Sequence, residues 1–218
     1  MIYTACLCIR NMVSTFTSCW RSLEQWSPRL FVLASVFLLV GAANSGLAFL
    51  HNGYAFNDWL GLVLELGRLT ALLGAAGLSV QVARRDARLG NLSRLVASLA
   101  VVFVTTLITL AALETAGVLA DPIGVIGLVA YVLSVGAFLT VGIGIVRTST
   151  HSQWVGGLLL ANVVALLVVF FGRLFVPLNL LAAVVPGVQV LLYLGIGYVL
   201  RGRSVPIRQT TPATDMTP

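Results

Sequence analysis

Apolar residues dominate six long stretches of the chain, each of about twenty positions, and polar residues gather between them. A helix needs about twenty apolar residues to cross the ~30 Å hydrocarbon layer of a membrane. A membrane β-barrel would instead show alternating segments of about ten residues, which this sequence lacks. The pattern therefore predicts an all-α, polytopic membrane bundle of six transmembrane helices. We expect these helices at residues 30–50, 59–83, 95–117, 123–146, 154–173 and 177–200.

Two flanking segments differ from this pattern. Residues 1–29 mix apolar and polar positions, which favours a cytoplasmic N-terminal segment forming an interfacial helix. Pro28 is expected to mark the entry to the first span. Residues 201–218 are polar and rich in Thr and Pro, which predicts a disordered tail. Residues 30–200 then form one transmembrane domain.

The distribution of arginine predicts the orientation of the bundle. All 13 basic residues are arginine: three precede the first span, four lie in residues 84–94, one is Arg147 and three follow the last span, so eleven share one side. Basic residues favour the cytoplasmic side of a membrane, so we expect a cell-membrane protein with both termini in the cytoplasm. The net charge of +6 therefore indicates a membrane rather than nucleic acid as partner. The four arginines of residues 84–94 are also a candidate site for anionic lipid, although orientation alone accounts for them: Arg84, Arg85, Arg88 and Arg94.

The remaining composition mainly excludes chemistry. Only 9% of residues are charged, whereas about a quarter is usual for a soluble domain. The absence of lysine excludes Schiff-base chemistry. The two histidines fall on opposite sides of the predicted membrane, so they cannot share a metal ion or haem. No spacing matches a catalytic motif, so we expect no enzyme, no cofactor and no metal. Three cysteines precede the first span and are expected to be free thiols: Cys6, Cys8 and Cys19.

The second predicted span contains two charged residues, Glu65 and Arg68, which share a helix face because they are three residues apart. A lone charge at this depth costs several kcal/mol, so the two side chains should pair. On the last span, Gln189 and Tyr193 belong to a polar face that should point into the protein. The other polar candidates lie in the predicted outer halves or at the outer ends of their helices: Asn44, Glu114, Arg173 and Asn179.

Two functions remain open. In the first, the protein is a non-catalytic membrane subunit or scaffold, held by small-residue helix packing and a charge network. Its small-residue faces would then bind a second copy or partner helices. In the alternative, Glu65 and Arg68 line an outward-opening polar pocket of a transporter or channel for a small solute or ion. An offset of 95 residues aligns a few Gly and Trp positions, which leaves an inverted internal repeat as an open hypothesis.

Overall fold

The computed structural model describes residues 2–50, 58–116, 123–149, 153–172 and 178–202. Within these ranges every regular element is an α-helix, and six helices are long and apolar enough to cross a membrane, as the sequence predicted. Their bounds are α1 Ile2–Leu50, α2 Asp58–Arg85, α3 Ala87–Thr115, α4 Ile123–Thr148, α5 Gln153–Gly172 and α6 Leu178–Arg201.

Helix α1 differs most from the expected bounds, because it is one helix of 49 residues that runs through Pro28. Proline removes the N–H that would otherwise bond to the carbonyl four residues earlier, here that of Glu24. Membrane helices tolerate this loss where neighbouring helices pack around the site. The backbone of α6 approaches at this point, since a Cβ built on Gly197 would lie 3.1 Å from the Pro28 carbonyl oxygen. Pro28 therefore lies inside a packed helix instead of at its start.

The predicted loop at residues 84–94 is also mostly helical, because α2 and α3 are separated by Asp86 alone. Asp86 is extended, and its side chain accepts a hydrogen bond of 3.0 Å from the N–H of Leu89, which caps the start of α3. Gly90 contacts the backbone of Ala83, so this tight turn requires a residue without a side chain. Arg84 and Arg85 consequently end α2 and Arg88 lies in the first turn of α3, whereas Arg94 lies about two turns inside α3.

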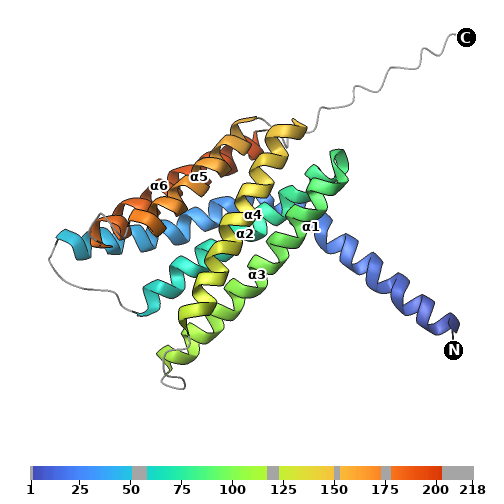
Figure 1. The fold of residues 1–218 in the computed structure, drawn as a ribbon, viewed down its shortest axis with the longest axis horizontal. Helices are drawn as coiled ribbons and strands as arrows, with labels where there is room; N and C mark the ends of the chain where they lie inside the picture. The colour runs from blue at the N-terminus through green and yellow to red at the C-terminus, as the bar shows by residue number, and fades with distance from the viewer. Residues whose placement is uncertain (1, 51–57, 117–122, 150–152, 173–177, 203–218) are drawn as a thin grey trace, which may run out of the picture.

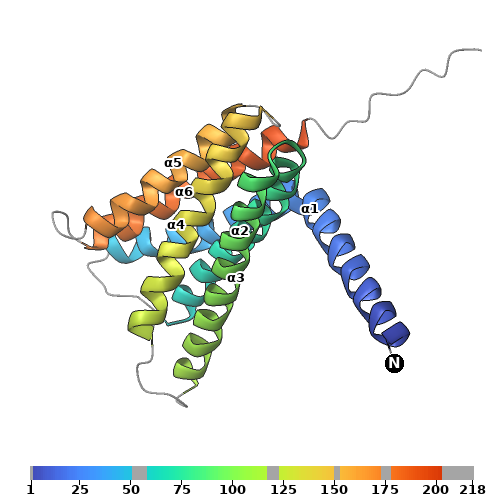
Figure 2. The same ribbon diagram turned by 45° about the vertical axis from the view of Figure 1, so that its right-hand side comes forward.

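The helices form a closed ring in which each packs against its neighbours in sequence and α6 packs back on α1 (Figure 1). Helix α2 additionally crosses the ring to contact α4. We call the end with the α2–α3 turn the arginine-rich end, because it carries Arg84, Arg85, Arg88, Arg94 and Arg147. In both views α3 and α4 diverge from α5 and α6 toward the opposite end, and the N-terminal part of α1 projects away from the bundle (Figure 2).

Small residues let the helix backbones approach closely. A Cβ on Gly77 of α2 would lie 2.5 Å from the Leu23 carbonyl oxygen of α1, and one on Gly156 of α5 would lie 3.0 Å from the Gly142 carbonyl oxygen of α4. The hydroxyl of Ser27 donates a 2.9 Å hydrogen bond to the Gly74 carbonyl across the α1–α2 contact. The bundle is therefore held by the small-residue packing that the sequence predicted. Buried small residues on these helices include Ser35, Gly74, Ala75, Ala76, Gly77, Ala130, Ser134, Ala137 and Gly144.

Candidate functional site

Glu65 and Arg68 form the ion pair that their spacing predicted. The Oε1 atom of Glu65 lies 3.0 Å from Nη1 of Arg68, and the two side chains retain 21% and 24% exposure. The second carboxylate oxygen of Glu65, Oε2, is buried and has no hydrogen-bond partner among the described residues. Half of this carboxylate is therefore an unused acceptor inside the bundle.

Arg68 connects the ion pair to the far side of the ring. Its guanidinium lies 5.6 Å from the ring centroid of Tyr131 on α4, within the range of a cation–π contact. The hydroxyl of Tyr131 donates a short hydrogen bond to the Leu166 carbonyl of α5. Arg68 also interacts electrostatically with Tyr193 of α6. The charged face of α2 thus points toward α4 and α6, and Tyr131 extends the contact to α5.

A second polar group joins α5 to α6. Nε2 of Gln189 donates a 3.1 Å hydrogen bond to Oδ1 of Asn162, and both side chains are buried. Tyr193, one turn further along α6, is buried close enough to Asn162 and Arg68 for both to act electrostatically on its hydroxyl. The amide nitrogen of Asn162, Nδ2, is buried and has no partner among the described residues. Asn162 Nδ2 is thus an unused hydrogen-bond donor, whereas Glu65 Oε2 is an unused acceptor.

These two groups make up what we call the central polar cluster: Glu65, Arg68, Tyr131, Asn162, Gln189 and Tyr193. Arg68 is ten residues from Asp58, where α2 begins, and Asn162 is ten residues from Gly172, where α5 ends. At 1.5 Å per residue each lies ~15 Å from that end, about halfway across a ~30 Å hydrocarbon layer. The cluster contains one anion and one cation, so its formal charge is zero. It offers hydrogen-bond donors and acceptors near the middle of a candidate membrane bundle.

The structure describes the other predicted site residues only in part. Glu114 lies partly exposed near the end of α3 and has no ion pair among the described residues. Asn44 lies half-buried on α1. Arg173 and the side chain of Asn179 fall outside what the structure describes. The contacts of the ion pair therefore run to α4 and α6.

Sequence reasoning did not select Tyr131 or Asn162 as site residues. Asn162 carried a usable signal, since an asparagine within an apolar span is costly unless it finds a partner. Tyr131 carried no such signal, because a tyrosine in a span is as typical of simple packing as of a functional site. Which faces of the fourth and fifth spans meet the second is a property of the tertiary fold, and neither spacing nor composition encodes it.

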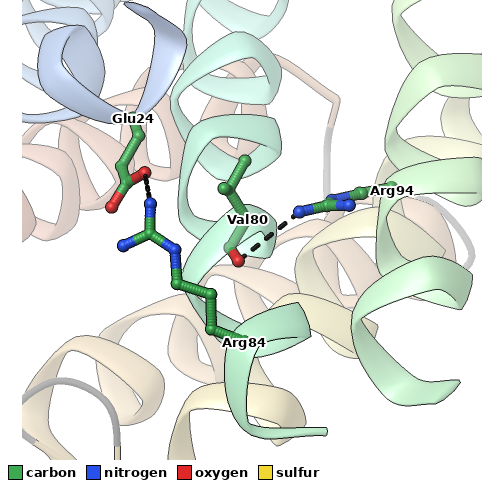
Figure 3. A network of polar contacts seen from close by, with 4 residues as sticks. All are labelled: Glu24, Val80, Arg84 and Arg94. Carbon is green, nitrogen blue, oxygen red and sulfur yellow. Dashed lines mark hydrogen bonds and ion pairs between the residues drawn. The ribbon is translucent and has the colours of Figure 1, made fainter. Parts of the chain in front are cut away.

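A separate polar network lies at the arginine-rich end (Figure 3). Nη2 of Arg84 lies 2.7 Å from Oε2 of Glu24, which joins α2 to α1. Arg94 donates a 3.5 Å hydrogen bond to the Val80 carbonyl, and its guanidinium lies 5.7 Å from the ring centroid of Trp20. These contacts tie the start of the packed part of α1 to the α2–α3 hairpin, which indicates a structural role.

No group of three or more potential metal ligands occurs among the described residues. Comparisons with protein families, with curated proteins and with solved structures found no match for this chain.

Proposed function

We propose that this protein is a multi-pass membrane transport protein that lets a small polar solute cross at the central polar cluster. The observation that carries the proposal is that Glu65 Oε2 and Asn162 Nδ2 are both buried and unpartnered within one cluster. A buried polar atom without a partner costs about 1–3 kcal/mol, so two of them in one polar cluster favour a site that a ligand or water completes. A donor from a solute or water would satisfy Glu65 Oε2, and an acceptor would satisfy Asn162 Nδ2.

The chemistry of the cluster favours an uncharged or zwitterionic solute. Glu65 and Arg68 already neutralise each other at 3.0 Å, so a solute with net charge would have to break that pair or remain uncompensated. A small molecule that carries hydroxyl or amide groups, or opposite charges on one skeleton, could bind both the donors and the acceptors of the cluster. The position of the cluster near mid-span is also where many transporters bind their substrates.

Flux measurements on the purified protein in phosphatidylcholine liposomes test the proposal. Stopped-flow light scattering would follow uptake of glycerol, urea and glycine betaine, with potassium chloride as the charged comparison. At least one of the three uncharged or zwitterionic solutes should enter faster than in protein-free liposomes. If none does, the proposal is wrong.

The variant Glu65→Gln tests whether the cluster is the site. It replaces an acceptor by a donor with little change in shape, so the loss of one hydrogen bond should slow flux about tenfold. Glu114→Gln is the matched control, because it makes the same change on α3 without touching a described ion pair. Equal flux in both variants would remove the cluster from the transport path.

A scaffold that binds partner helices remains a second candidate, and the exposed face of α3 favours it. This helix is the least buried of the six candidate spans. Its exposed large residues, Leu92, Leu95, Leu99 and Val102, repeat at the spacing of a coiled-coil seam. The small residues expected to serve as partner surfaces are largely buried within the chain's own bundle. If the purified protein is an oligomer that Leu95→Ala together with Leu99→Ala dissociates, as measured by light scattering, and flux is absent, the scaffold function is favoured.

A further inference from the structure

Three arginines at the arginine-rich end remain exposed, and neither an ion pair nor a hydrogen bond is seen for them in the described part of the chain: Arg85, Arg88 and Arg147. The other two arginines of the α2–α3 segment do have partners. Arg84 is paired with Glu24, and Arg94 contacts the Val80 carbonyl and the Trp20 ring (Figure 3). The positive-inside rule explains why arginines lie at this end. It does not explain why, among the described residues, two of them are tied into the fold and these three are not.

The fold brings the three arginines together from separate helices. Helices α2 and α4 run in the same direction and touch where a Cβ on Gly144 would lie 2.8 Å from Val82. Arg85 and Arg147 each follow this contact by three residues, so both lie ~4.5 Å nearer the same end of the bundle. Arg88 follows Arg85 across the one-residue turn and lies in the first turn of α3. The three arginines therefore lie at neighbouring ends of α2, α3 and α4.

The one acidic residue in this turn does not neutralise the cluster by an ion pair. Asp86 turns its carboxylate back to accept the Leu89 N–H at 3.0 Å, and this hydrogen bond caps α3. Counting Asp86, these four residues keep a formal charge of +2. A concentration of guanidinium groups beside helices long enough to cross a membrane matches the phosphate of a lipid headgroup, which arginine binds through paired N–H donors.

We propose that Arg85, Arg88 and Arg147 bind the headgroup of an anionic phospholipid at the membrane surface. The proposed site therefore differs in its residues from the four-arginine site expected from the sequence. Arg84 and Arg94 serve the fold, and Arg147, which is distant in the sequence, takes part in lipid binding. The lipid's acyl chains would lie against the apolar outer faces of the same helices, where Leu92 and Val146 are exposed.

Native mass spectrometry of the protein in detergent tests this proposal. Titration with phosphatidylglycerol and, separately, phosphatidylcholine gives a dissociation constant for the first lipid bound. The wild-type protein should prefer phosphatidylglycerol. Each arginine near an anionic headgroup contributes about fivefold, so replacing all three by glutamine should weaken phosphatidylglycerol binding about a hundredfold and leave phosphatidylcholine binding unchanged.

The control is Arg29→Gln, which removes one exposed arginine that lies 4.8 Å from the Trp26 ring centroid on α1. This variant should bind phosphatidylglycerol within twofold of the wild type, whereas Arg85→Gln or Arg147→Gln alone should lose about fivefold. The single variants keep the test valid if the triple variant fails to fold. Unchanged phosphatidylglycerol affinity in both single variants, or a retained lipid preference in the triple variant, would overturn the proposal, as would an equal loss in Arg29→Gln. Displacement of the lipid by an equal concentration of inorganic phosphate would show a site for free anions and would also overturn it.

Discussion

Replacing Gly77 by alanine should push α1 and α2 apart, because the added Cβ would lie 2.5 Å from the Leu23 carbonyl oxygen and 2.8 Å from its carbon. Both atoms are backbone, so no side chain can move aside. Ordinary contact begins near 3.4 Å, so the helices must separate by about 1 Å, and a gap of this size forfeits a quarter to a half of the dispersion attraction along the contact. Such overpacking typically costs about 1–3 kcal/mol.

Gly61→Ala on the same helix is the matched control, because a Cβ there meets nothing within 4 Å. Both substitutions gain the same helix propensity, roughly 1 kcal/mol, so the difference between them isolates the cost of packing. We expect Gly77→Ala to be less stable than Gly61→Ala by about 1–3 kcal/mol. Unfolding in mixed micelles by titration with sodium dodecyl sulfate, followed by far-ultraviolet circular dichroism, measures this difference. Equal midpoints, or a higher midpoint for Gly77→Ala, would refute the close α1–α2 contact.

Three further predictions use the same unfolding assay. Asp86→Ala removes the N-cap of α3 and should destabilise the protein by about 0.5–2 kcal/mol, whereas Asp86→Asn should be nearly neutral. Arg84→Ala should destabilise the protein more than Glu24→Gln does. The first change leaves the Glu24 carboxylate, which has 15% exposure, without its partner, whereas the Arg84 side chain has 61% exposure and can turn to solvent when Glu24 is replaced. A reversed order of stabilities would contradict this geometry. Ser27→Ala removes the hydrogen bond to the Gly74 carbonyl and should cost about 1 kcal/mol, and an unchanged midpoint would count against that bond.

The sequence predicted the six membrane-length helices because each depends only on local composition. It misplaced features that depend on contacts between helices. Pro28 lacks a backbone N–H, which predicts a helix boundary. It nevertheless lies inside α1, where it packs against α6. The segment 84–94 reads as a loop because it is polar, yet capping by Asp86 and the absence of a side chain at Gly90 allow an almost direct helix–helix turn.

The candidate site was predictable only in part for the same reason. The Glu65–Arg68 pair follows from a spacing of three residues on one helix, which is local information. The burial of Gln189 and Tyr193 follows from the polar face of the last span. The meeting of Gln189 with Asn162, 27 residues away on another helix, requires the rotation and tilt of both helices, which periodicity does not supply.

Access of an external reagent to the central polar cluster tests the account most directly. The three native cysteines would first be replaced by serine, and Asn162→Cys and Leu159→Cys would then be made separately on α5. Both positions are fully buried, but only Asn162 belongs to the cluster. A small, membrane-impermeant methanethiosulfonate, added outside sealed liposomes, should modify Asn162→Cys and leave Leu159→Cys unmodified, with mass spectrometry as the readout. Protection of both cysteines would mean that no aqueous path reaches the cluster, and the transport function would be contradicted.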